Sequence, residues 1–538
     1  MRYSNYIILT AVIIITISIA NDYSITIDEP TRRSFGIQYL KLSFEKFGIN
    51  LDLLKDVKGS NNSEQRFIDM YGMVFEFPAL ALEFLFSPNS NKTTYLIRHI
   101  LNHIFFLSAI VMLFQIFKNL YKDRILSYLA CIFIYLNPVI FGSSFFNCKD
   151  IIFLFSISFF LFCFQKYQKK ISYLTLILLA MSIGICTSIR NVGIYLLPTS
   201  LIFSFLIMLE QNRMLDFAFL LAFLKNLVFL STFSFLFTFM LIPEVWFSDF
   251  MDFINSYKSS AKHWHEGPVL YRGEFYHTKN LPIHYPLYRF FVETPVTFLL
   301  LLFLGFNNYV YKIFLKVKQD TIFHLAFISI LIPVSLVIIL KPILYDGWRH
   351  FFFIYTFLVF FIVMGFKFIV DTFDDKYKKS ITFFLAIICF LEPLISVIKY
   401  HPYQYLYKNN LISSNPIRSN GSEIQGMSYY DGFKWIAKND SSKLKVWVRK
   451  TEAKYNLQLL PKKLQDKIEI IGYDNKQPLF NYEGSDKIDY YLTNYYNQFP
   501  HIEKYIARSI GYEFDEVFSK YVAGEKIFSV FKLEKSIH

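Results

Sequence analysis

The sequence is poor in charged residues and in cysteine, and each shortage excludes a class of protein. Only 18% of its 538 residues are charged, whereas 54% are hydrophobic and 63 are phenylalanine. A water-soluble fold of this length could not bury so much apolar surface, so the chain as a whole is not a soluble protein. Its five cysteines show neither a CxxC pattern nor the spacing of a disulfide framework. We therefore expect them to be small core residues.

Two further observations concern targeting and partners. The first apolar run, residues 7–20, follows Arg2, but no convincing small-x-small cleavage site precedes Asn21. It is therefore predicted to remain as a membrane span and not to be removed as a signal peptide. The net charge of +13 would suit nucleic acid, but basic residues of membrane proteins mark cytoplasmic loops and meet anionic headgroups. We expect a lipid bilayer as partner and no nucleic acid.

The sequence is rich in apolar runs of roughly 15–20 residues, about the length a helix needs to cross a bilayer. About eleven such runs predict a polytopic α-helical membrane domain over residues 1–400. The runs are 7–20, 101–117, 125–140, 151–164, 171–188, 192–209, 226–242, 295–306, 322–340, 351–370 and 381–398.

Charge on the loops predicts the orientation of these spans. Basic residues gather on every second loop, for example at residues 118–124, 166–170 and 312–318. Such loops are typically cytoplasmic. The N-terminus is therefore expected on the cytoplasmic side, and everything after Ile398 on the outer side.

The other loops carry both signs of charge together with His and Trp. Because they alternate with the basic loops, they should all lie on the outer side. This co-location predicts one outward-facing site better than any single motif does. The clusters are Asp28-Glu29 in a first outer loop over 21–98, Asn147 to Asp150, Arg190, a long loop over 244–289, and Tyr345 to His350.

Two regions outside the spans have patterns of their own. Residues 35–54 and 67–86 carry apolar residues at helical spacing, typical of amphipathic helices that cap a membrane domain or guide a substrate. Residues 401–538 are predicted to form a small soluble α/β domain. This domain shows no phosphate loop, catalytic triad or metal cluster, so its role stays open. Its predicted strands are 445–448, 468–472, 489–493 and 527–533.

Asp28 and Glu29 are the predicted catalytic residues. A carboxylate at the membrane surface can act as a general base that takes a proton from an attacking hydroxyl. Partial desolvation would raise its pKa, and neighbouring cations would lower it. The alternatives are a solvated loop or an N-cap of the helix that follows.

Cations on the outer side predict a phosphate-binding site. Lys149, Arg190 and Arg349-His350 depart from the positive-inside trend, and together they supply the charge that a phosphate needs. Each one alone is equally compatible with a structural ion pair. Asp150, Asp346 and Trp348 are predicted to support these cations, although Asp150 would serve as well to cap the next helix.

Histidines raise the question of a metal. His99 and His103 share a helical face at a spacing that can chelate zinc, but no third ligand is evident. No metal ligands are assigned, and a divalent metal ion stays open as a cofactor. Four more histidines lie with Trp264 in the 244–289 loop, where they would stack against a sugar or pack the loop: His263, His265, His277 and His284.

Several of these residues stand in segments that resemble one family of enzymes. Over residues 1–405 the chain resembles the GT-C superfamily of membrane glycosyltransferases, specifically its glycosyltransferase family 39 branch. That branch includes the protein O-mannosyltransferases and the lipid A aminoarabinose transferases. The segments are Asp28-Glu29-Pro30, Tyr71-Gly72, Tyr95–Asn102 (YLIRHILN), Asn137–Asp150 (NPVIFGSSFFNCKD), Tyr345–His350 (YDGWRH) and His401–Tyr405 (HPYQY).

The resemblance implies an activity. Such enzymes transfer a sugar from a polyprenyl-phosphate lipid, with inversion, to a lipid, glycan or protein acceptor on the outer face. It assigns Asp28 as the base and Glu29 as its acidic neighbour. Ser143 and Cys148 depart from the family pattern, which leaves the substrate subclass open. The C-terminal domain does not resemble the sugar-binding trefoil of eukaryotic mannosyltransferases, so protein acceptors are less favoured. The Lys-, Ile- and Asn-rich composition points to a bacterial inner membrane.

Two other functions fit parts of the pattern. A secondary transporter of an anionic or lipid-linked substrate would be expected to carry ionisable groups inside its spans and often to have repeated halves. Here the span interiors are almost free of such groups, and no internal repeat is seen. A non-catalytic scaffold that displays the C-terminal domain would need no cationic cluster opposite Asp28.

Overall fold

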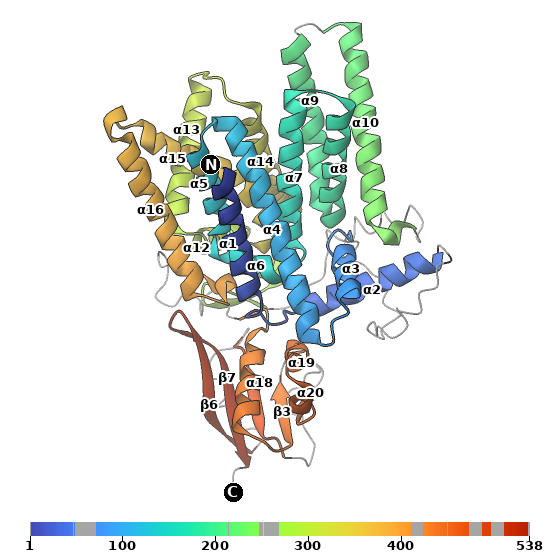
Figure 1. Cartoon of the computed structure of the whole chain (residues 1–538), viewed down its shortest axis with the longest axis vertical. Helices are drawn as coiled ribbons and strands as arrows, with labels where there is room; N and C mark the ends of the chain where they lie inside the picture. Colours follow the sequence, from blue (N-terminus) through green and yellow to red (C-terminus); the bar gives the residue numbers. More distant parts are fainter. Residues whose placement is uncertain are drawn as a thin grey trace.

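The computed structural model of the chain has a bundle of helices with a small sheet domain at one end (Figure 1). Four residues named above lie outside the part that the structure describes: Tyr71, His263, Trp264 and His265. The described residues are 2–46, 48, 72–212, 215–246, 251, 255, 268–409, 411, 423–448, 450–472, 487–495 and 511–535.

Within the described residues, eight helices are long and apolar enough to cross a membrane. A bent pair of helices and two shorter apolar helices, α1 (Arg2–Ala20) and α8 (Tyr173–Ile189), account for the other predicted segments. The polytopic helical class is therefore confirmed. The eight are α4 (Asn91–Tyr121), α7 (Asp150–Lys169), η2 (Asn191–Tyr195) with α9 (Leu196–Asn212), α10 (Phe217–Leu241), α13 (Val296–Phe314), α14 (Thr321–Leu340), η5 (Arg349–Phe351) with α15 (Phe352–Asp371), and α16 (Asp375–Lys399).

The segment predicted as one span over 125–140 is not a straight helix. It forms α5 (Arg124–Tyr135) and α6 (Pro138–Phe146), which meet at an angle of 67°. Asn137 ends the first helix and caps the second, because its side chain accepts a hydrogen bond from the amide of Ile140. Pro138 then occupies the first helical turn, where its missing N–H is tolerated. The bend places α6, which is buried along its whole length, beneath the outer loops.

The bundle has buried central helices and exposed peripheral ones. In α7 and α15, 78% of the spanning window is buried, against 17% in α10 and α16. The exposed apolar faces of α10 and α16 suit contact with lipid. Helices α13 and α15 approach closely at Gly305 and Gly365, where an added Cβ would collide with backbone oxygens of the facing helix.

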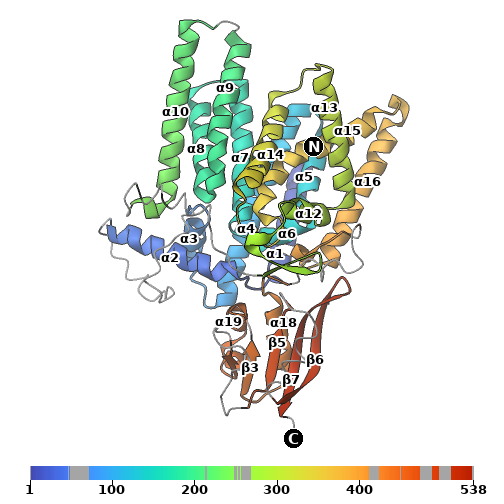
Figure 2. The ribbon, with the colours of Figure 1, turned by 180° about the vertical axis from the view of Figure 1, so that it is seen from behind.

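The first long loop, which was predicted to lie on the outer side, contains two helices that lie at the end of the bundle facing the sheet domain (Figures 1 and 2). Helix α2 (Asp28–Lys46) begins seven residues before the predicted 35–54 segment. Helix α3 (Glu76–Phe86) lies within the predicted 67–86 segment, whose described part begins at residue 72. Asp28 and Glu29 stand in the first turn of α2, where negative charge is favourable. Helix α4 starts inside the predicted loop, at Asn91, because Ser90 caps it.

The second long outer loop contains a β-hairpin. Strands β1 (Pro268–Tyr271) and β2 (Glu274–His277) are antiparallel. Arg272 and Gly273 both have positive φ angles, as a two-residue hairpin turn requires. Helix α12 (Tyr285–Val292) leads from the hairpin back to the bundle.

The C-terminal part forms a five-stranded mixed sheet in the order β4-β3-β5-β7-β6, with α18 (Ser428–Asn439), α19 (Glu452–Leu457) and α20 (Lys462–Gln465). All four predicted strands are confirmed, as β3 (Leu444–Val448), β4 (Ile468–Ile471), β5 (Tyr490–Thr493) and β7 (Glu525–Lys535). Strand β6 (Tyr512–Val522) was not predicted. It is a charged, partly exposed edge strand, so it lacks the regular apolar alternation that identifies strands.

Candidate functional site

Arg349 links two predicted acidic residues at the end of the bundle that faces the sheet domain. Its Nη1 donates to Asp28 Oδ2 at 2.9 Å, and its Nη2 lies 2.9 Å from Asp346 Oδ2. Electrostatic interactions also join Lys149 to Asp28 and to Asp150. The structure thus gathers cations and carboxylates from the first loop, the 147–150 loop and the 345–350 segment in one place.

The acidic residues of this group differ in exposure. The side chain of Asp28 is 53% exposed, whereas those of Glu29, Asp150 and Asp346 are at most 10% exposed. The bond that Asp28 accepts from Arg349 goes to its Oδ2. Of these four residues, Asp28 alone offers a carboxylate that an incoming hydroxyl can reach.

Nearby cations set the protonation state of Asp28. Partial desolvation by the surrounding protein would by itself raise the pKa of this carboxyl. Arg349, Lys149 and Arg32 outweigh that effect, so the pKa of Asp28 lies below its ordinary value of 3.8. Asp28 is therefore ionised at neutral pH, which a proton acceptor requires.

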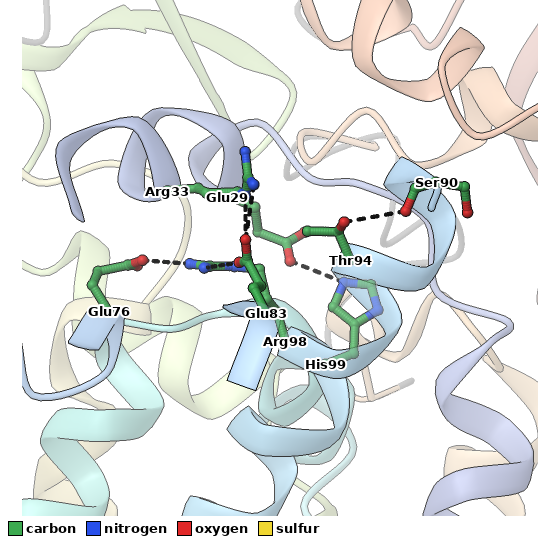
Figure 3. A network of polar contacts seen from close by, with 8 residues as sticks. All are labelled: Glu29, Arg33, Glu76, Glu83, Ser90, Thr94, Arg98 and His99. Carbon is green, nitrogen blue, oxygen red and sulfur yellow. Dashed lines mark hydrogen bonds and ion pairs between the residues drawn. The ribbon is translucent and has the colours of Figure 1, made fainter. Parts of the chain in front are cut away.

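Glu29 is buried and turned toward α4. Its Oε2 accepts hydrogen bonds from the amide and the hydroxyl of Thr26, both at 2.9 Å. Its Oε1 lies 2.9 Å from Nε2 of His99 (Figure 3). With both oxygens engaged, Glu29 fixes the start of α2 against α4 and so holds Asp28 in position.

A second network fixes α2 and α3 to α4. The guanidinium of Arg98, 2% exposed, bonds to Glu76 Oε2 at 2.6 Å and to Glu83 Oε1 at 2.9 Å (Figure 3). Glu83 also accepts from Arg33 on α2 at 2.9 Å. Sequence analysis did not assign these residues. An arginine within the apolar YLIRHILN segment was the available signal, because a charge there must be paired.

The 147–150 loop is held by Asn147. Its Oδ1 accepts from the amides of Lys149 and Asp150 at 3.3 and 2.9 Å, so Asn147 satisfies the free amides at the start of α7. Asp150 accepts from Arg190 and, at 2.9 Å, from Asn147 Nδ2. Its side chain therefore positions Arg190 and does not serve as the cap.

The YDGWRH segment is shaped by an unusual backbone. Asp346 and Gly347 have φ angles of 57° and 77°, and the amide of Gly347 donates to the hydroxyl of Tyr285 at 2.9 Å. Trp348 is buried and packs edge-on against Phe290 and Phe352, which anchors the segment in the bundle. His350 packs against the ring of Tyr345 at 5.0 Å.

Beside Arg349 lies a small cavity of about 60 Å³ whose ionic residues the sequence analysis did not single out. Glu293 pairs with Arg289 and, at 2.7 Å, with the ammonium of Lys408. All three residues line the cavity with Arg349 and Asp346. Burial lowers the pKa of Lys408 to about 8, although Glu293 opposes the shift. No motif marks Lys408, because it reaches the cavity from beyond the last span.

The histidines that the structure describes have separate partners. His99 bonds to Glu29, whereas Nδ1 of His103 lies 2.7 Å from Oγ of Ser144. His277 accepts from the amide of Lys279 at 3.3 Å, and the ring of His284 lies 5.9 Å from that of Tyr271. Within the described ranges, no group of three His, Cys, Asp or Glu residues could hold a metal ion.

Comparison with known proteins gives structural matches alone. No protein-family model and no curated protein matches the chain. ArnT from Cupriavidus metallidurans bound to undecaprenyl phosphate is similar over 98% of this chain and 98% of its own, with 10% sequence identity and a TM-score of 0.46. ArnT from the same organism in the apo state is similar over 99% and 98%, with 10% identity and a TM-score of 0.44.

Proposed function

We propose that this chain is an integral membrane glycosyltransferase. It moves a sugar from a polyprenyl-phosphate lipid to an acceptor hydroxyl on the outer side of a membrane, with inversion. The observation that carries the proposal is the half-exposed, ionised carboxylate of Asp28, which lies among cations at one end of the helical bundle. The family 39 resemblance of the segments around these residues supports the same assignment.

The chemistry is one displacement at the anomeric carbon of the sugar. The bond from this carbon to the donor phosphate breaks while the bond to the acceptor oxygen forms. The acceptor hydroxyl gives its proton to Asp28. A retaining enzyme would need a second accessible carboxylate as nucleophile. Glu29, Asp150 and Asp346 are buried and engaged, which favours direct displacement and inversion.

The cations stabilise the leaving group. A polyprenyl phosphodiester carries one negative charge, and the departing phosphate carries one more. Arg349 and Lys149 lie beside Asp28 and can take up this charge as it develops. Arg190 forms an ion pair with Asp150 and so helps to position the loop that carries Lys149. His350 lies close to these cations, and burial together with them disfavours a positive charge on its ring, so it would offer the donor phosphate a hydrogen bond and not a charge.

Donor binding would also make Asp28 a better base. The cations that lower the pKa of Asp28 are those proposed to bind the phosphate. When they pair with the phosphate, their effect on Asp28 weakens and its pKa rises toward the ordinary value. A stronger base is thus formed when a donor is present. Arg349 therefore couples donor binding to proton acceptance.

We place the site on the periplasmic side of a bacterial inner membrane, with the N-terminus in the cytoplasm. Basic residues at the opposite end of the bundle support this orientation. A secondary transporter is less favoured, because the charges gather at one end of the helices and Arg98, within α4, is paired with Glu76 and Glu83.

The decisive experiment compares envelope lipids and glycans by mass spectrometry in cells that carry wild-type protein or Asp28→Asn. The variant should lose one sugar modification and accumulate the polyprenyl-phosphate sugar. Asp22→Asn is a matched control, because Asp22 precedes Asp28 by six residues, is likewise half exposed at 51%, and pairs with His401 and not with Arg349. The control should retain the modification. Normal modification by a folded Asp28→Asn protein would overturn the proposed function.

A further inference from the structure

A large polar cleft lies between the membrane bundle and the C-terminal domain, close to the candidate site. Its volume is about 1,200 Å³. Arg33 of α2 and the start of α4 line one side, and α18 with residues 458–465 lines the other. This volume exceeds the roughly 300–1,000 Å³ of pockets for drug-sized ligands. The cleft is therefore large enough for several sugar units.

The two walls are held in register. Asn91 Nδ2 donates to Gln458 Oε1 across the cleft at 3.1 Å. Behind it, Asn456 Nδ2 donates to the backbone oxygen of Ile25 at 2.9 Å, and Leu459 packs against Ile25 and Tyr95. The C-terminal domain is thereby attached to the segment that leads into Asp28. The cleft is formed by this attachment, because its lining residues come from both domains.

The charge of the lining is of one sign. Among the described residues that line the cleft there is no Asp or Glu. Lys434 lies 5.0 Å from the centroid of the Tyr430 ring, which presents an aromatic face inside the cleft. Asn89, Gln458 and Gln465 add amide groups that can bond to hydroxyls. The cationic lining residues are Arg33, Lys92, Lys434, Lys438 and Lys462.

One residue that lines the cleft, Arg33, shares helix α2 with the candidate base. Arg33 follows Asp28 by five residues on α2, a rise of roughly 7–8 Å at 1.5 Å per residue. Its guanidinium is held by Glu83, the residue that also holds Arg98 (Figure 3). A chain of sugars bound in the cleft would have to extend past Arg33 along α2 for one of its hydroxyls to reach Asp28.

We propose that this cleft binds an anionic saccharide, phosphorylated or carboxylated, that carries the acceptor hydroxyl. Amides and an aromatic ring suit sugar units. Arg33 pairs with Glu83 and Lys462 with Asp466. Lys92, Lys434 and Lys438 are therefore the lining cations that suit acidic groups on the sugars. The identification of this saccharide as the acceptor rests on the proposed function. The cleft as a binding site for an anionic saccharide stands on its own geometry.

The test uses the full chain in nanodiscs of zwitterionic lipid, with oligogalacturonate as a carboxylated probe and maltodextrin of equal length as a neutral one. The protein should bind oligogalacturonate, more weakly as salt increases, and should not bind maltodextrin. The variant Lys434→Glu/Lys438→Glu should lose at least about tenfold in affinity, equivalent to ~1.4 kcal/mol. Both lysines are exposed, so the change should leave the fold intact.

A matched control changes the same charges elsewhere on the C-terminal domain. Lys443 and Lys487 are exposed and do not line the cleft, so Lys443→Glu/Lys487→Glu should bind as the wild type does. Equal losses in both double variants, or equal binding of both probes, would overturn the proposal. Loss of oligogalacturonate binding in anionic-lipid nanodiscs would also overturn it, because the cleft would then bind membrane headgroups.

Asp28→Asn separates this inference from the proposed function. If both hold, Asp28→Asn abolishes transfer but keeps oligogalacturonate binding. The Lys434→Glu/Lys438→Glu variant then keeps polyprenyl-phosphate binding but raises the KM for acceptor. If Asp28→Asn transfers normally, the proposed function fails, while the binding assay still decides on the cleft. If Lys434→Glu/Lys438→Glu binds oligogalacturonate as tightly as the wild-type protein does, the proposed saccharide site is wrong, and the proposed function is unaffected.

Discussion

Arg349 donates a hydrogen bond to Asp28 at 2.9 Å, although the two residues are 321 positions apart in the chain. The contact joins the first outer loop to the segment before the last pair of spans. It keeps the exposed carboxylate of Asp28 ionised and places a guanidinium where a phosphate would need it. Proton acceptance and donor binding therefore depend on one ion pair.

The first prediction concerns donor binding. Arg349→Ala or Lys149→Ala should weaken binding of polyprenyl monophosphate by about tenfold or more, because each removes a cation beside the phosphate. Binding can be measured with purified protein in nanodiscs. Lys367→Ala is the control, because Lys367 pairs with an exposed Asp371 at the opposite end of α15. Unchanged affinity in both site variants would remove the phosphate from this group.

The second prediction concerns pH. A carboxylate with a lowered pKa stays ionised to a lower pH, so transfer should be lost only as pH falls through a value below 3.8. Arg349→Gln removes the main lowering cation and leaves desolvation, so the acid limb should move to higher pH. The measurement is kcat/KM against pH for both proteins. The pH at which kcat/KM falls on the acid side reports the pKa of Asp28 even if Arg349→Gln lowers the maximal rate.

The same profiles test the coupling between donor and base. The profile of kcat/KM reports the free enzyme, and that of kcat reports the complex with substrate. Because bound phosphate should raise the pKa of Asp28, the acid limb of kcat should lie at higher pH than that of kcat/KM. Coincident limbs would show that the donor phosphate does not share the cations of Asp28.

The third prediction concerns the stability of the first outer loop. Arg98→Met leaves the buried Glu76 without its ion-pair partner and leaves Glu83 with Arg33 alone, which should cost about 3–5 kcal/mol. Thermal unfolding in detergent, followed by tryptophan fluorescence, measures the loss. Lys318→Met, whose partner Glu210 is exposed, should change stability little.

A triple variant separates charge from packing in that network. Adding Glu76→Gln and Glu83→Gln to Arg98→Met removes the unpaired buried charges, so much of the lost stability should return. If the triple variant is no more stable than Arg98→Met, the arginine acts through its packing against Phe75.

Sequence patterns predicted the helical class and most of the sheet, because burial in a membrane or a sheet leaves a local periodic signal. Ile468–Ile471 and Tyr490–Thr493 are short buried strands that such a signal identifies. The pattern failed at 125–140, where both helices are apolar and only Asn137-Pro138 marks the bend. It failed again at β6, whose edge position removes the alternation.

The sequence by itself determined which residues carry charge at the ends of apolar helices, since a charge in the middle of a span is costly. Only the tertiary structure decided their roles. Glu29 and Asp28 are neighbours in the chain, but the first turn of α2 directs one toward His99 and leaves the other exposed beside Arg349. Lys408 and the cleft between the two domains depend on long-range packing, which leaves no local pattern in a sequence.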